Sequence, residues 1–246
     1  MRAEVVFIDR NAAVVDAWKY QFEDIESPPA IVSGDIFQVD VDAILVPGNA
    51  FGFLDRGLEL QACERYGFEL QDGLRDAIRA RFRGELLVGQ ALVLPEVPPD
   101  RPRAIVYSAQ YRTPAATDGS LVAYLTARGA FLALEALEAE RGEAAPALRV
   151  AVPGIGTGPG LGTGSGGNPS APGGASARLD PRVSARQLRY AWEIFTGRRG
   201  YGDKNLTQLT RREAKLRRLP RPLASDDDDD GDGDGDGDDY TPRARR

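Results

Sequence analysis

The fold class follows from residues 42–49, Asp-Ala-Ile-Leu-Val-Pro-Gly-Asn, in which an unbroken apolar run ends at a Pro-Gly pair. An apolar run without polar alternation predicts a strand that is covered on both faces, as in parallel sheets. Strands and helices alternate on either side of it. We predict strands over residues 3–8, 30–32, 86–88, 91–94, 104–107 and 148–152, and helices over 11–22, 57–83, 119–140 and 183–196. The alternation predicts a three-layer α/β/α fold with a central mixed, largely parallel sheet.

The composition excludes several classes of protein. The chain has no histidine and one cysteine, Cys63, which excludes Ser-His-Asp and Cys-His catalysis, His-based zinc sites and an internal disulfide. The sequence demands neither a cofactor nor a metal. No apolar run approaches the ~20 residues that span a bilayer, and the N-terminus lacks the apolar region of a signal peptide. We therefore expect a cytoplasmic protein without a membrane partner.

Two segments have compositions that do not support a core. Residues 158–178 are rich in Gly, Ser and Pro, and residues 226–239 contain only Asp and Gly. Neither segment buries enough apolar surface to offset the entropy of ordering it. We expect one domain over residues 1–197, with 158–178 as a flexible insertion, followed by a disordered tail over 198–246.

The tail is charge-segregated. Residues 198–225 contain nine Arg or Lys and two acidic residues, whereas residues 226–246 contain ten Asp and three Arg. A short basic helix over Leu206 to Leu219 would suit the phosphates of nucleic acid. The neighbouring Asp/Gly run competes for the same charges, so we do not expect a nucleic-acid partner.

Three loops follow predicted strands, and ligands of such sheets bind outside the carboxyl ends of the strands. The loops contain Gly34-Asp35-Ile36, residues 47–59, and Gly154-Ile155-Gly156-Thr157-Gly158. The last loop offers backbone N–H groups with few side chains in the way, which suits a diphosphate, although a plain flexible loop has the same composition.

Each polar residue in these loops has a structural alternative to a functional role. Asp35 is either a turn residue or an acceptor for an exocyclic amine. Asn49 either caps a turn or orients a ribose hydroxyl or a water. Glu59 lies in the first turn of a predicted helix, where the helix dipole alone favours a carboxylate, so its position does not make it catalytic.

In their order along the chain, these loops resemble the macrodomain family of ADP-ribose-binding and Appr-1″-p-processing modules. Residues 34–36 and 41–49 are similar to the family's G-D-I and V-D-A-I-V-N-A-A-N segments, and residues 152–158 to its P-x-I-x-T-G loop. Residues 50–59 resemble the S-F-G-F-M-D-G-G-I-D turn of a bacterial and phage branch. The resemblance covers about residues 30–197.

The resemblance implies a role for each loop. The implied ligand-binding residues are Asp35 at the adenine amine, Ile36 near the base, Asn49 at the distal ribose, Gly57 and Leu58 at the phosphates, and Gly154, Ile155, Gly156, Thr157 and Gly158 around the diphosphate. Asn49 and Glu59 are the catalytic candidates. In hydrolytic members an acidic residue at the position of Glu59 helps to activate water.

Two departures from the family leave the activity open. The usual Asp is Glu59 here, which moves the carboxylate outward by about 1.5 Å, and Arg56 stands where many members have glycine. Three functions therefore remain. The chain is a hydrolase of an ADP-ribosyl adduct, O-acetyl-ADP-ribose or ADP-ribose 1″-phosphate, a reader that binds ADP-ribose without turnover, or a structural macrodomain-like module. We expect ADP-ribose or an ADP-ribosylated substrate as partner, and the oligomeric state stays open.

Overall fold

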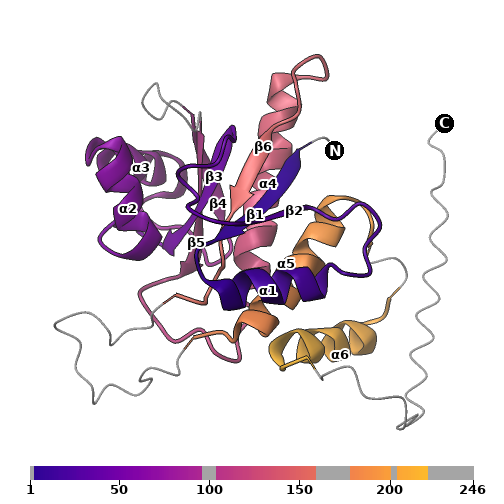
Figure 1. Cartoon of the computed structure of the whole chain (residues 1–246). Helices are drawn as coiled ribbons and strands as arrows, with labels where there is room; N and C mark the ends of the chain where they lie inside the picture. Colours follow the sequence, from indigo (N-terminus) through magenta and orange to yellow (C-terminus); the bar gives the residue numbers. More distant parts are fainter. Residues whose placement is uncertain (1–2, 96–103, 159–177, 201–203, 221–246) are drawn as a thin grey trace, which may run out of the picture.

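The computed structural model describes residues 3–95, 104–158, 178–200 and 204–220 (Figure 1). Their strands form one sheet in the order β2-β1-β6-β3-β5-β4. Its strands are β1 (Glu4–Asp9), β2 (Ala30–Ser33), β3 (Ala43–Asn49), β4 (Ala91–Pro95), β5 (Ala104–Tyr111) and β6 (Arg149–Val152). All neighbouring strands are parallel except β4 and β5, which are antiparallel. The mixed, largely parallel sheet is therefore confirmed.

Helices cover both faces of this sheet (Figure 1). One face packs against α1 (Ala12–Gln21), α4 (Val122–Arg141) and α5 (Pro181–Phe195), and the other against α2 (Gly57–Tyr66) and α3 (Glu69–Phe82). Successive strand residues point to opposite faces: Leu45 lies in the first core, and Ile44 and Val46 in the second. Because both sides are apolar, the three-layer arrangement is confirmed. Within the described residues, no helix combines the length and hydropathy that a membrane span requires.

Two predicted elements differ in the structure. The helix expected over residues 57–83 is divided into α2 and α3 at Gly67, whose φ of 95° suits glycine and ends the first helix. The strand expected over residues 86–88 is wrong. Leu86 N donates to Ala50 O at 2.9 Å and Gly89, with φ of 84°, turns the chain, so only β4 enters the sheet.

Helix α6 (Leu206–Arg217) corresponds to the short basic helix named over Leu206 to Leu219, within the segment otherwise expected as a disordered tail. It begins at a capping box, in which Asn205 Oδ1 accepts from Gln208 N at 3.1 Å and Gln208 Oε1 accepts from Asn205 N at 2.9 Å. Leu216 is buried, and Gln187 Nε2 of α5 donates to its carbonyl at 3.0 Å. The packed part of the chain therefore extends beyond residue 197. Residues 159–177 of the expected insertion and the Asp/Gly run at 226–239 lie outside the described residues.

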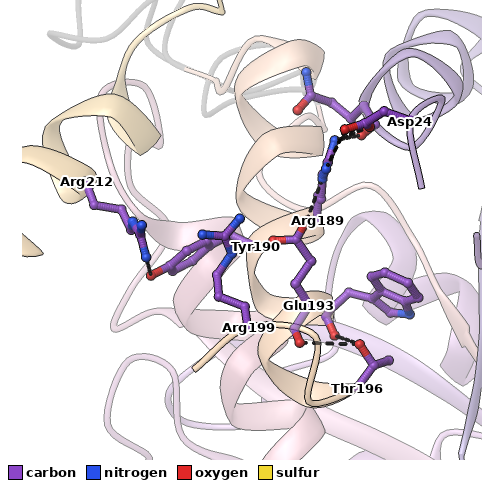
Figure 2. A network of polar contacts seen from close by, with 9 residues as sticks. Asp24, Arg189, Tyr190, Glu193, Thr196, Arg199 and Arg212 are labelled. Carbon is purple, nitrogen blue, oxygen red and sulfur yellow. Dashed lines mark hydrogen bonds and ion pairs between the residues drawn. The ribbon is translucent and has the colours of Figure 1, made fainter. Parts of the chain in front are cut away.

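A polar network fixes α5 to its neighbours (Figure 2). Arg189 donates to Asp24 Oδ1 at 2.6 Å, just after α1, and to Glu193 Oε1 at 2.7 Å, one turn further along α5. Glu193 is buried, and its second oxygen accepts from Arg199 at 2.5 Å. The hydrogen bond from Arg189 lowers the pKa of Asp24. Because two guanidinium groups compensate the buried carboxylate, the network joins α1, α5 and the chain that follows α5.

Candidate functional site

The predicted ligand loops lie at one edge of the sheet. The strands β2, β1, β6 and β3 are parallel, so their carboxyl ends lie on the same side of the sheet. Asp35 and residues 154–158 follow β2 and β6, and Asn49 is the last residue of β3. The chain continues from β1 to its neighbour β2, and from β3 in the opposite direction towards β5. A reversal of this kind opens a crevice at the carboxyl ends of the strands, here between β1 and β3. The distance from β2 to β3 is three strand spacings, about 14 Å.

Glu59 is the most buried carboxylate at this edge. It lies in the first turn of α2 and is 3% exposed. Its Oε1 accepts three hydrogen bonds, from Asn49 N at 3.2 Å, from Asn49 Nδ2 at 3.1 Å and from Tyr107 Oη at 3.2 Å. Its Oε2 accepts no hydrogen bond from a described residue and is not among the fully buried polar atoms. One oxygen therefore fixes the side chain while the other remains for a ligand or a water.

Burial controls the acid–base behaviour of this cluster. Desolvation raises the pKa of Glu59 from 4.5 to about 7, against the opposing effect of the hydrogen bonds from Asn49 and Tyr107. Burial and the nearby Glu59 raise the pKa of Tyr107 well above its usual range. Burial likewise raises the pKa of Tyr111, opposite Asn49 in the sheet, to about 12. Glu59 is thus the group here that gains or loses a proton near neutral pH.

Asn49 serves its own turn in the structure. Its Oδ1 accepts from Phe51 N at 3.1 Å and from Phe53 N at 3.2 Å, and its Nδ2 donates to Phe53 O at 2.6 Å and to Glu59. An amide has two donors and two lone pairs, so these four bonds use its capacity. Asn49 caps the turn, which is the structural alternative weighed for it, and in addition it donates to Glu59. Its predicted contact with a ribose would require one of these bonds to break.

Both carboxylate oxygens of Asp35 also accept hydrogen bonds from the protein. Its Oδ1 accepts from Phe37 N at 3.0 Å, as a turn residue does, and its Oδ2 accepts from Arg10 Nη2 at 2.5 Å. The Arg10 side chain is mostly exposed and that of Asp35 is not. A ligand amine that binds Asp35 therefore meets a guanidinium beside it. Ile36, the next residue, is buried in the core under this turn.

The glycine-rich loop after β6 is fixed mainly through its carbonyl groups. Gly156 O accepts from Thr117 Oγ1 and Leu179 N, both at 2.9 Å, and Ile155 O accepts from Ser184 Oγ at 2.8 Å. The first N–H of the loop, that of Gly154, donates to Asp9 Oδ2 at 3.1 Å. The N–H groups of residues 155–158 donate to no described residue. The loop thus keeps backbone donors for an anion, but with a carboxylate at its start.

The N-terminus of α2 lies beside Glu59 and has no side-chain cap. Gly57 has φ of 53°, and a Cβ at this position would meet no atom within 4 Å, so the approach to its backbone is open, whereas Leu58 beside it is half-buried. Arg56 precedes them and pairs with Asp55, Nε to Oδ1, at 3.1 Å. Uncapped N–H groups and a guanidinium favour an anion here.

Sequence reasoning missed Tyr107, Asp9 and Arg10. A tyrosine in a buried strand needs a partner for its hydroxyl, and Tyr107 Oη donates to Asn49 O at 2.8 Å as well as contacting Glu59. Arg10 directly follows the first strand, so the rule that selected Asp35 applies to it too. Within the described residues, no group of three or more Cys, Asp or Glu side chains is placed to bind a metal ion.

No family model matches the chain, and no curated protein is similar enough to count as a match. Among solved structures, the macrodomain of Mycobacterium tuberculosis DarG aligns with 66% of this chain and 88% of its own at 20% identity, with a TM-score of 0.47. The macrodomain of Thermus aquaticus DarG aligns with 65% and 87% at 20% identity and a TM-score of 0.45. An Oceanobacillus iheyensis macrodomain mutant with ADPR aligns with 65% and 91% at 14% identity and a TM-score of 0.39. The chain is therefore similar to macrodomains, at a level on which no assignment of function rests.

Proposed function

We propose that the chain binds ADP-ribose or a derivative of it along the carboxyl edge of the sheet, and hydrolyses an adduct at the distal ribose. The base lies beside Asp35 and Ile36. The diphosphate lies on residues 154–158 and at the N-terminus of α2, with Gly57 and Leu58. The distal ribose lies beside Asn49 and Glu59.

The order of the loops in space supports this ligand. A base, a diphosphate and a second ribose, joined in that order, require an amine acceptor, an anion site and a carboxylate along one line. The strand order β2-β1-β6-β3 presents Asp35, then residues 154–158, then Glu59. The resemblance of the same segments to the macrodomain family supports the same order.

The single observation that carries the catalytic part is the environment of Glu59. A buried carboxylate whose pKa is about 7 accepts a proton efficiently at neutral pH. Water attacks the electrophilic atom of the bond that joins the adduct to the distal ribose, and its proton passes to Glu59 while that bond breaks. Glu59 then returns the proton to the leaving group. Tyr107 and Asn49 act through Glu59 as positioning residues.

Binding without turnover is the second candidate, and the saturated amide of Asn49 favours it. An amide that already makes three hydrogen bonds within its own turn and a fourth to Glu59 has none left to orient a ribose. In that case Glu59 would still accept a bond from a ribose hydroxyl, and the site would recognise ADP-ribose without cleaving an adduct.

The first experiment is a calorimetric titration of the full chain with ADP-ribose, beside Asp35→Ala and a control, Asp16→Ala, on the exposed side of α1. A charge-assisted hydrogen bond is worth roughly 1.5 to 3 kcal/mol, so we expect Asp35→Ala to weaken binding at least about tenfold. The control should bind like the wild type. No heat at millimolar ligand would reject the proposed ligand and leave the structural alternative.

A second experiment separates the hydrolase from the reader. Wild type and Glu59→Gln are incubated with ADP-ribosylated protein, O-acetyl-ADP-ribose and ADP-ribose 1″-phosphate. Turnover that disappears in the variant while ADP-ribose binding persists supports the hydrolase. Binding by the wild type with no turnover of any of the three supports the reader.

A further inference from the structure

Helix α6 presents one defined face to the rest of the molecule. Leu216 is buried against α5, and Arg212 Nη1 donates to Tyr190 Oη at 3.3 Å (Figure 2). At the end of α6, Arg186 Nη1 donates to the carbonyls of Lys215 at 2.7 Å and Arg218 at 3.3 Å. These contacts fix the rotation of the helix about its axis, so the side that faces solvent is fixed as well.

A solvent-exposed side of the helix, next to the end where Arg186 contacts the carbonyls of Lys215 and Arg218, carries positive charge. Arg211, Lys215 and Arg218 are all exposed, and their spacing of four and three residues places them on one side of the helix. We call these three residues the basic stripe. The one acidic residue of the helix, Glu213, pairs with Arg217 at 2.7 Å and lies apart from the stripe. The stripe is therefore a surface suited to a polyanion.

The same chain supplies a polyanion close by. Residues 226–239 contain ten Asp, four Gly and no basic residue, and they begin eight positions after Arg218. The seven intervening residues reach at most about 24 Å, whereas the 12 residues of α6 extend about 18 Å. The acidic segment is thus long enough and near enough to run back along the whole helix.

We propose that residues 226–239 bind the basic stripe of α6 in the same chain and compete there with external polyanions. Tethering over a short connection gives an effective concentration on the order of millimolar, which a separate polyanion has to exceed. The contact is electrostatic and exposed, so added salt weakens it. Nucleic acid is the alternative occupant of the stripe, and the test distinguishes the two.

Zero-length carbodiimide cross-linking of the full chain tests the contact directly, because the chain has only three lysines, Lys19, Lys204 and Lys215. Lys204 and Lys215 lie at the two ends of α6, and Lys19 on α1 is the internal control. We expect peptide mapping to show residues 226–239 joined to Lys215 and Lys204 and not to Lys19, with a loss of both products in high salt. Equal yields at all three lysines, or none, would overturn the proposal.

Lys215 is close to the acidic segment along the chain, so a matched variant separates binding from proximity. Arg211→Gln with Arg218→Gln removes two charges of the stripe and leaves all three lysines. We expect at least a fivefold loss of the Lys204 product in this variant. An unchanged yield would show that the tether alone brings the groups together, and would reject the proposal.

Competition is measured with a labelled single-stranded oligonucleotide in low salt. Replacing the ten Asp of 226–239 by Asn in the full chain should tighten binding about tenfold or more, and adding Arg211→Gln and Arg218→Gln should reverse the gain. Equal affinity of the wild type and the Asn variant would mean that the acidic segment does not occupy the stripe. None of these measurements involves ADP-ribose, so their outcome is independent of the function proposed above.

Discussion

Glu59→Gln should make the protein more stable at alkaline pH, and by an amount that depends on pH. In the folded chain the pKa of Glu59 is raised from 4.5 to about 7. A pKa difference of one between the folded and unfolded states corresponds to about 1.4 kcal/mol, so keeping this carboxylate ionised costs the fold about 3 kcal/mol. The folded state binds the proton more tightly than the unfolded state. The stabilisation of the folded state by this proton on Glu59 is therefore complete below pH 4.5 and is lost as the pH rises through 7.

An amide at this position does not ionise, yet its oxygen still accepts from Asn49 and Tyr107. We expect the free energy of unfolding of Glu59→Gln, minus that of the wild type, to rise by about 3 kcal/mol between about pH 4 and pH 8. Urea denaturation of both proteins across this range measures the difference. The control is Glu64→Gln on the exposed side of the same helix, where no buried charge is removed. A difference that stays flat, or that falls towards alkaline pH, would refute the reasoning on Glu59.

Three further predictions concern other contacts described above. A methyl group at Gly48 would collide with Glu59 Oε1 and Tyr107 Oη, so Gly48→Ala should lower the free energy of unfolding by about 1–3 kcal/mol. On α3, a Cβ at Gly73 meets no atom within 4 Å, so Gly73→Ala should raise the free energy of unfolding by about 0.4–1 kcal/mol. Thermal denaturation of the two variants tests both values. Arg10→Ala removes the group that competes with a ligand for Asp35 Oδ2. Because an exposed ion pair is worth about 0.2–1 kcal/mol, calorimetry should show that this variant binds ADP-ribose up to about fivefold more tightly than the wild type. Weaker binding by the variant would contradict the prediction. Gln187→Ala leaves Leu216 O without its donor from α5, so amide hydrogen exchange over residues 206–217 should accelerate by at least about fivefold, and unchanged protection would show that the other contacts of α6 suffice.

Much of the fold was predictable because apolar periodicity and turn residues act locally. The buried run 43–46 predicted β3, and the alternation of strands with helices predicted a sheet covered on both faces. The division of the helix at Gly67 was harder to predict, because Gly67 and Gly73 look alike in sequence. The first adopts a positive φ and ends a helix, and the second continues one. Only the packing of α2 and α3 against the sheet separates the two cases.

The candidate site was predictable in position but not in its hydrogen bonding. The rule that ligands bind after strands selected Asp35, Asn49 and residues 154–158. It did not predict that Arg10 would donate to Asp35, or that Asn49 would use all its hydrogen-bonding capacity on its own turn and Glu59. Such contacts depend on the lateral order of strands, which brings together residues far apart in the chain. The bond from Gly154 to Asp9 joins positions 145 residues apart.

Strand β6 has a consequence for how the protein is made in the cell. It is the last strand in the described part of the chain, yet it lies between β1 and β3. Until residues 149–152 leave the ribosome, no described strand joins the pair β2-β1 to the group β3-β5-β4. At a synthesis rate of roughly 5–20 residues per second, the 100 residues that separate Asn49 from Arg149 take on the order of 5–20 s. During this time β1 and β3 each expose an unpaired edge, which is a surface for chaperones and for aggregation. The nascent chain therefore completes its sheet late, when β6 is inserted, and α5 and α6 pack after that.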